Sequence, residues 1–118
     1  DCATVLITDD NQFNQLALMT LLQQFNLSGD VASDGFEAMQ LVERRLASGA
    51  PMYGLIMMDF SMPGMDGTTC TKKIRELLNG RGLRPRICCV TAYSDREYKD
   101  MAFGVGMDEF MTKPVFKN

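Results

Sequence analysis

The chain has 118 residues, of which 46% are hydrophobic, so it is long enough for one domain with a core of its own. A net charge of -3 and a pI near 4.8 argue against direct nucleic-acid binding, and no apolar run approaches the ~18 residues of a membrane span. The chain has no histidine and no C-x-x-C pair, so zinc binding is not expected, and its four cysteines are expected to be reduced core residues of a cytoplasmic protein.

Predicted strands and helices alternate along the whole chain. Short apolar runs predict the strands, and apolar residues at three- and four-residue spacing predict the helices. In chain order these elements are the strand Val5–Ile7, a helix from Asp10 or Asn11 to about Phe25, the edge strand Asp30–Ala32, a helix from Asp34 to Gly49, the strand Tyr53–Met58, a helix from Asp66 to Asn79, the strand Arg86–Val90, the helix Asp95–Phe103 and the strand Asp108–Thr112. This alternation predicts an α/β fold with a doubly wound, five-stranded parallel sheet.

Capping patterns mark the beginnings of two of the helices. Asp34 followed by Glu37, and Ser94 followed by Glu97, have the spacing of capping boxes. Both patterns place an acid in the first turn, where the helix dipole favours it.

Polar residues of different kinds follow four of the predicted strands. The first strand delivers Asp9 and Asp10, the third Asp59, the fourth Thr91 and the fifth Lys113. The carboxyl ends of parallel strands share one rim of the sheet, so we expect these side chains to meet. Three carboxylates repel one another, and a hard divalent cation such as Mg²⁺ relieves that repulsion. Together with an ammonium, a hydroxyl and a free carboxylate oxygen, such a site is suited to hold a phosphoryl group.

Each of these residues also has an ordinary structural explanation. Asp9 and Asp10 could cap a helix, and Asp59 could begin a turn. Thr91 is a common strand residue, and Lys113 could simply be solvated. Taken singly, the structural explanation is favoured for each of them. The convergence of four strand ends on one chemistry is much harder to attribute to chance, so the functional interpretation is preferred for the set.

These same stretches resemble the receiver domain of the two-component response-regulator family. The matching motifs are Thr8-Asp9-Asp10-Asn11, Met58-Asp59, Met62-Pro63-Gly64-Met65-Asp66-Gly67, Val90-Thr91-Ala92 and Thr112-Lys113-Pro114. They span nearly the whole chain in the order and spacing of the family. The start of the chain, which includes Asn14, most resembles receivers attached to hybrid histidine kinases.

The resemblance implies an acceptor and a metal site. Asp59 matches the phospho-accepting aspartate, and Asp10 and Asp59 match the side-chain ligands of Mg²⁺. Asp9 matches an acid that acts on the metal largely through water. Ser61 stands where the family gives a backbone carbonyl to the metal.

Three further residues match the conformational switch of the family. Thr91 matches the hydroxyl that moves to the phosphoryl group, Lys113 the lysine that pairs with it, and Phe110 the aromatic that changes rotamer on activation. The family also implies a flavodoxin-like fold with strand order 2-1-3-4-5. That order places the first and third strands side by side, as the acid cluster requires.

The implied function is that of a phospho-accepting signalling domain. Asp59 is expected to take a phosphoryl group from a phosphohistidine and to switch the conformation that a partner recognises. Because the chain has no histidine, the donor is expected to be a histidine kinase or a histidine phosphotransfer protein. The domain is expected in the cytoplasm, including as part of a membrane-anchored hybrid kinase, without membrane contact of its own. Ser61 and Tyr93 are expected to flank the path of a water that attacks the phosphate. Tyr93 is bulky and has no carboxylate to orient that water, so slow loss of the phosphate is predicted.

The alternative function is that of a Mg²⁺-dependent aspartyl-phosphate phosphatase or hydrolase. Such enzymes usually need a second acid two residues after the nucleophile, where this chain has Ser61. They also carry a cap insertion, for which this chain has no room. A receiver-like domain that only binds partners is disfavoured because the acceptor, metal, hydroxyl and lysine residues are all present.

A fifth helix, which the family places after Pro114, is expected to be missing or truncated. Right-handed crossovers put the first helix on one face of the sheet and the other three on the opposite face. Apolar strands such as Leu55–Met57 and Ile87–Val90 are then expected to expose several hundred square ångströms on the single-helix face. We therefore expect residues 1–118 to be a single domain from a longer protein, or a dimer partner or swapped segment to cover that face.

Overall fold

The five predicted strands form one parallel sheet in the computed structural model, which describes residues 4–92 and 95–113. Their order, 2-1-3-4-5, confirms the predicted doubly wound, flavodoxin-like arrangement. From one edge of the sheet to the other, the strands are β2 (Gly29–Ala32), β1 (Val5–Thr8), β3 (Leu55–Asp59), β4 (Arg86–Thr91) and β5 (Glu109–Thr112). Asp59 pairs with Val90, and Thr91 pairs with Thr112, so the carboxyl ends of these strands align at one rim.

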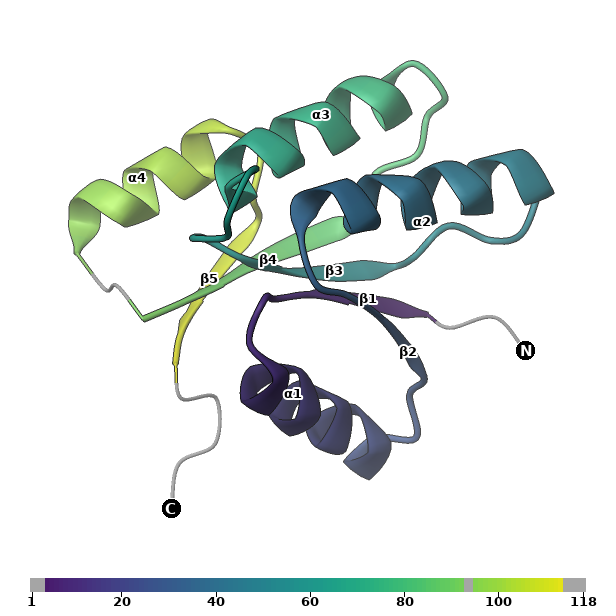
Figure 1. Cartoon of the computed structure of the whole chain (residues 1–118). Helices are drawn as coiled ribbons and strands as arrows, with labels where there is room; N and C mark the ends of the chain where they lie inside the picture. The colour runs from purple at the N-terminus through teal and green to yellow at the C-terminus, as the bar shows by residue number, and fades with distance from the viewer. Residues whose placement is uncertain (1–3, 93–94, 114–118) are drawn as a thin grey trace.

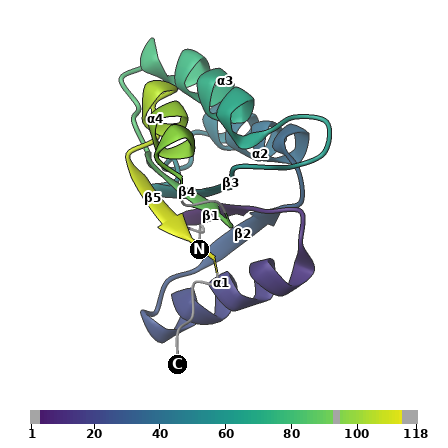
Figure 2. The same ribbon diagram turned by 90° about the vertical axis from the view of Figure 1, so that its left-hand side faces the viewer.

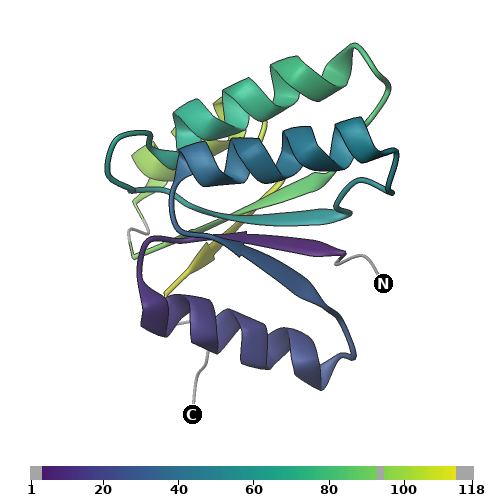
Figure 3. The same ribbon diagram turned by 45° about the vertical axis from the view of Figure 1, so that its right-hand side comes forward.

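Four helices in the described residues cover the two faces of the sheet. They are α1 (Gln12–Gln24), α2 (Gly35–Ser48), α3 (Gly67–Asn79) and α4 (Arg96–Gly104). Figure 1 and Figure 3 show α1 alone on one face with α2 and α3 on the other, and Figure 2 shows α4 beside α3. This arrangement confirms the distribution expected from right-handed crossovers. Within residues 4–92 and 95–113, no helix has the length and apolarity that a membrane span requires.

The larger hydrophobic core lies between the sheet and the three helices. Leu6, Ile56 and Ile87 are fully buried there, together with Ile74 and Leu78 of α3. Helices on both faces bury both sides of the central strands, which explains why these strands are apolar throughout instead of alternating.

The face under α1 is better covered than the sequence suggested. Met57, Cys88 and Val90 are at most 5% exposed, and they form a second apolar cluster with Leu18 and Leu22 of α1. Partly buried methionines from α1 and β5 pack against this cluster, and such long, flexible side chains fill irregular gaps. The expectation that these strands would expose several hundred square ångströms here was therefore wrong for the described residues.

The third strand begins two residues later than predicted, because Tyr53 is held outside it. The Tyr53 hydroxyl donates to a carboxylate oxygen of Asp30 at 2.6 Å, and its side chain is buried. Gly54 then donates its N–H to the carbonyl of Thr4, and β3 pairs with β1 from Leu55 onward.

Side-chain caps begin three of the helices, as their sequences indicate. Asn11, Asp34 and Asp66 each accept a hydrogen bond from the backbone N–H three residues later. Asp95 is the N-cap of α4 and makes no side-chain cap hydrogen bond, whereas Ser94 of the predicted capping box lies outside the described residues.

Candidate functional site

The carboxyl ends of three strands bring two acids and one lysine together. Asp9 follows β1, Asp59 ends β3 and Lys113 follows β5. The Lys113 ammonium lies 3.1 Å from Oδ2 of Asp9 and 3.2 Å from Oδ1 of Asp59. This convergence of residues from distant parts of the chain is the one predicted from the strand ends.

Asp10 completes an acid cluster at the same rim. Carboxylate oxygens of Asp9, Asp10 and Asp59 all lie within 4.8 Å of one another. Asp9 and Asp59 are buried, whereas Asp10 is exposed. Three hard oxygen donors around one position, only partly balanced by one ammonium, form a suitable site for a divalent cation.

Electrostatics at this rim oppose ionisation of Asp59. Burial and then the charge of Asp9 raise the pKa of Asp59 to about 6, although Lys113 and the Ser61 N–H act in the opposite direction. Burial lowers the pKa of Lys113, but the charges of Asp59 and Asp9 outweigh it, and that pKa lies above its ordinary value. The lysine is therefore a fixed positive charge at neutral pH. One ammonium does not balance the negative charge of the acid cluster.

Residues at the start of α1 hold Asp9 in place. Its Oδ1 accepts hydrogen bonds from the Asn11 N–H at 2.9 Å and from Nδ2 of Asn14 at 3.5 Å. The Gln15 amide donates to the carbonyl of Asp9 at 2.7 Å and to the Ser33 hydroxyl at 3.3 Å. Gln15 was missed in the sequence, where its one signal is an amide in the first helical turn after the acid pair.

The loop after Asp59 passes very close to β3. The Ser61 N–H donates to Oδ1 of Asp59 at 3.4 Å. Gly67 donates its N–H to the carbonyl of Phe60, and a Cβ atom at Gly67 would overlap the carbonyl oxygen of Asp59. Only glycine fits here, which gives the Asp-Gly step at the start of α3 a physical reason that the sequence alone did not show.

Phe60 is a second residue that sequence reasoning missed. It directly follows Asp59, is buried, and packs edge-on against Tyr98 of α4 with ring centroids 5.2 Å apart.

The two predicted switch residues lie on the neighbouring strands. Thr91 is buried at the end of β4, and its backbone carbonyl accepts a hydrogen bond from the Lys113 backbone N–H at 2.7 Å. Phe110 is half-buried on β5, and the Lys99 ammonium lies 5.6 Å from the centroid of its ring.

Tyr93 and Pro114, which the sequence analysis also names, lie outside the described residues, as Ser94 does.

Comparison with known proteins agrees with this geometry. Residues 5–118 match the family model described as the response regulator receiver domain. The chain belongs to this family. It is a receiver domain of two-component phosphorelay signalling, and the hydrolase alternative is not favoured.

Individual relatives place the receiver domain in larger proteins. Hybrid signal transduction histidine kinase K of Dictyostelium discoideum is 36% identical over 119 residues, which cover 97% of this chain and 9% of that kinase. This receiver domain therefore spans about a tenth of the length of that relative.

Solved structures show the same fold. The receiver domain of the histidine kinase CKI1 from Arabidopsis thaliana, in complex with Mg²⁺ and BeF3-, is similar with a TM-score of 0.85 and 29% identity, over 96% of this chain and 82% of that one. The receiver domain of Ssk1, crystallised with the histidine phosphotransfer protein Ypd1 of Saccharomyces cerevisiae, is similar with a TM-score of 0.83 and 27% identity, over 98% of this chain and 83% of that one.

Proposed function

We propose that Asp59 is the phospho-acceptor of this receiver domain. The observation that supports this assignment is the Lys113 ammonium, held between Asp9 and Asp59 at 3.1 and 3.2 Å. Asp9 is engaged by the start of α1, and Asp10 is exposed, so Asp59 is the buried acid that remains for chemistry. Its contacts with Lys113 and Ser61 both fall on Oδ1, which leaves Oδ2 for attack on phosphorus.

The proposed reaction is a phosphoryl transfer from a partner's phosphohistidine. A bond forms between phosphorus and Oδ2 of Asp59 while the bond between phosphorus and the imidazole nitrogen breaks, giving an acyl phosphate. With a pKa of about 6, Asp59 is mostly ionised at pH 7 and can act as a nucleophile. Lys113 carries the positive charge that faces the phosphoryl oxygens.

The acid cluster is the proposed site for Mg²⁺. Asp9, Asp10 and Asp59 would hold the ion with their carboxylates, together with the backbone carbonyl of Ser61. When bound, the ion supplies positive charge that neutralises the phosphoryl oxygens. The residues present fit this role because they all offer hard oxygen donors. The single ammonium of Lys113 does not neutralise their negative charge.

We propose that Thr91 and Phe110 form the conformational switch. The Thr91 hydroxyl would bind the phosphoryl group, and its departure from its present position would let Phe110 turn inward. The hydrogen bond from the Lys113 N–H to the Thr91 carbonyl joins the ends of β5 and β4, which must respond together to phosphorylation. The phosphoryl group would thus act as a local charge that shifts the equilibrium between two conformations of Thr91 and Phe110.

The proposed partner is a histidine kinase or a histidine phosphotransfer protein that docks beside the acid cluster on α1. Phe13 and Leu16 lie one helical turn apart in the first half of α1 and are 84% and 66% exposed. Exposed apolar residues at this spacing are suited to a groove or helix of a partner. The proposed context is a hybrid histidine kinase acting in the cytoplasm, and the free, buried cysteines of the described residues suit a reducing compartment.

Phosphorylation of the isolated chain tests the acceptor. Incubation with Mg²⁺ and acetyl phosphate should add one phosphoryl group that is lost at alkaline pH, located by mass spectrometry at Asp59. Asp59→Asn should abolish the modification, whereas Asp100→Asn on the exposed side of α4 should not change it. Equal phosphorylation of Asp59→Asn would contradict the assignment.

A second measurement separates docking from chemistry. Phe13→Ser combined with Leu16→Ser should leave labelling by acetyl phosphate unchanged but slow transfer from phosphorylated Ypd1 roughly tenfold or more, as expected for loss of an apolar anchor. Equal transfer rates from Ypd1 to the wild type and the double variant would show that α1 is not the docking surface.

A further inference from the structure

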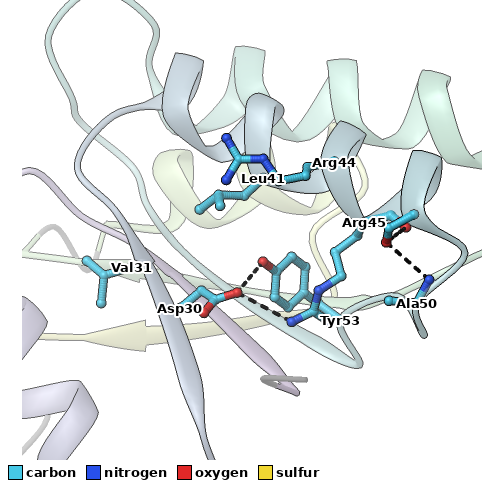
Figure 4. Close-up of a pocket in the computed structure, with 8 residues that line it drawn as sticks. Asp30, Val31, Leu41, Arg44, Arg45, Ala50 and Tyr53 are labelled. Atoms are coloured by element: carbon cyan, nitrogen blue, oxygen red, sulfur yellow. Dashed lines mark hydrogen bonds and ion pairs between the residues drawn. The ribbon is translucent and has the colours of Figure 1, made fainter. Parts of the chain in front are cut away.

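A pocket lies at the end of the sheet opposite to the acid cluster. It has a volume of about 430 Å³ and is formed by the second half of α2, the residues after it and the edge strand β2. Its lining is Asp30, Val31, Leu41, Arg44, Arg45, Ser48, Ala50 and Tyr53. Figure 4 shows Asp30, Arg45 and Tyr53 meeting on one side of it, with Leu41 and Arg44 above them.

One wall of the pocket is a fixed polar network. The Arg45 guanidinium lies over the Tyr53 ring, 4.0 Å from its centroid, and donates to the carbonyl of Pro51 at 2.9 Å and to Asp30 at 3.3 Å. Burial and then Asp30 raise the pKa of Tyr53, so its hydroxyl stays protonated and donates to the same Asp30 oxygen. The Arg45 side chain is only 11% exposed, and the network is therefore held ready without a ligand.

Positive charge in this pocket exceeds the negative charge that faces it. The hydrogen bonds to Pro51 and Asp30 occupy two of the five N–H groups that a guanidinium offers, so Arg45 keeps donors for another acceptor. Arg44 is exposed, and no hydrogen bond or ion pair engages it in the part of the chain that the structure describes. Two arginines thus face a single carboxylate, Asp30, in a chain whose net charge is -3.

Apolar side chains complete the pocket. Leu41 and Ala50 line it beside the arginines, whereas the side chain of Val31, which also borders the pocket, packs against the apolar cluster under α1. A pocket of this volume, with an apolar wall and a few convergent charged groups, is of the size that small molecules occupy. Guanidinium groups match the geometry of carboxylate and phosphate oxygens, with two parallel N–H donors for two oxygens.

We propose that this pocket binds a small organic oxyanion, a carboxylate or a phosphate monoester. Its anionic group is held by Arg44 and by the free N–H groups of Arg45, and its carbon body lies against Leu41. The site is separate from the phospho-acceptor, because Asp30 and Tyr53 stand near the amino ends of β2 and β3, whereas Asp59 stands at the carboxyl end.

Backbone NMR of the ¹⁵N-labelled 118-residue chain tests this proposal. Succinate, sn-glycerol 3-phosphate and sodium chloride are titrated separately at matched ionic strength, with EDTA present so that the acid cluster holds no metal. Saturable shifts at Asp30, Arg45 and Ala50 with succinate identify a carboxylate, and the same shifts with the phosphate ester identify a phosphate. Shifts that follow ionic strength alone and match those with sodium chloride would overturn the proposal.

Two arginine variants separate a site from general charge attraction. Arg44→Gln should weaken binding about fivefold or more, because a charge-assisted pair of hydrogen bonds is lost without disturbing the Arg45 and Tyr53 network. Arg81→Gln removes an exposed arginine in the turn after α3 and should bind like the wild type. Equal weakening in both variants would show that only the net charge matters and would refute the pocket as a site.

Discussion

Asp59 is an acid kept in an environment that disfavours its charge. Burial and Asp9 raise its pKa to about 6, so the folded state binds a proton more readily than the unfolded chain does. The contribution of Asp59 to stability is therefore fully present below about pH 4 and is lost as pH rises through about 6. At pH 7 the ionised carboxylate destabilises the metal-free domain.

Asp59→Asn should consequently stabilise the metal-free domain at pH 7 by roughly 1–2 kcal/mol, while removing phosphorylation. The amide keeps the shape of the side chain, and part of the gain is offset because Lys113 loses one partner. Urea unfolding in EDTA at pH 7 and pH 4 measures the effect, and the difference between variant and wild type should be smaller at pH 4. A variant that is less stable than the wild type at pH 7 would show that the Lys113 ion pair outweighs the repulsion.

Gly67 should tolerate no side chain. A Cβ atom there would overlap the carbonyl oxygen of Asp59, so Gly67→Ala must displace either β3 or the start of α3. We expect a loss of roughly 2–4 kcal/mol in the free energy of unfolding and slower phosphorylation. Gly80→Ala is the matched control, because Gly80 has an ordinary helical backbone and no atom within 4 Å of an added Cβ. Unfolding curves that coincide for the two variants would refute the close approach.

At the scale of elements, one carboxylate joins α3, β4 and β5. Oδ2 of Asp108 accepts the Ile87 N–H at 2.9 Å and the Arg75 guanidinium at 2.8 Å, and Oδ1 pairs with Arg84 at 2.9 Å. Arg75 is buried in α3 and also donates to the carbonyl of Gly106. This network fixes where β5 starts, and β5 carries Phe110 and leads to Lys113.

Asp108→Asn should cost about 2 kcal/mol at pH 7, because a buried arginine loses its counter-charge. Burial raises the pKa of Asp108, but the Ile87 N–H and the charges of Arg75 and Arg84 outweigh it, so the pKa lies below its ordinary value. The stabilisation is thus present above about pH 4 and is lost as pH falls through the folded-state pKa. Unfolding measured from pH 7 to pH 3 should show the variant and wild type converging at low pH.

Glu109→Gln provides the control for that measurement. Its ion pair with Arg86 is 3.5 Å long, and both side chains are more than half exposed, so its loss should change stability by less than about 0.5 kcal/mol at any pH. A cost for Asp108→Asn that stays constant down to pH 3 would mean that its charge is not what holds β5.

At the scale of the whole molecule, the acid cluster should link metal binding to stability. Mg²⁺ that binds only the folded domain stabilises it by about 1.4 kcal/mol at a concentration ten times the Kd. Asp10→Ala should remove most of this gain while leaving the metal-free stability within about 0.5 kcal/mol, because Asp10 is exposed. Thermal unfolding with Mg²⁺ and with EDTA measures both. An undiminished gain in Asp10→Ala, or a phosphorylation rate that survives chelation, would contradict the proposed metal site.

The sequence by itself determined the order of the elements and the residues that meet at the rim. Apolar runs that do not alternate require a sheet covered on both faces, and parallel strands carry their carboxyl ends to one side. Asp9, Asp59 and Lys113 could therefore be predicted from the sequence to lie together. The motifs at the strand ends, taken together in their order and spacing, were sufficient to recognise the family.

Only the tertiary structure decided how tightly those residues are held and what surrounds them. The hydrogen bonds of Gln15, the space at Gly67 and the Arg75 to Asp108 network each join segments far apart in sequence, and such contacts leave no periodic pattern to detect. The burial of Met57 was also missed, because flexible side chains from α1 and β5 cover that face, and periodicity describes the face of an element but not how neighbouring side chains fill gaps. The pocket of Arg44 and Tyr53 likewise exists only because α2 lies beside β2, a pairing that depends on the packed fold.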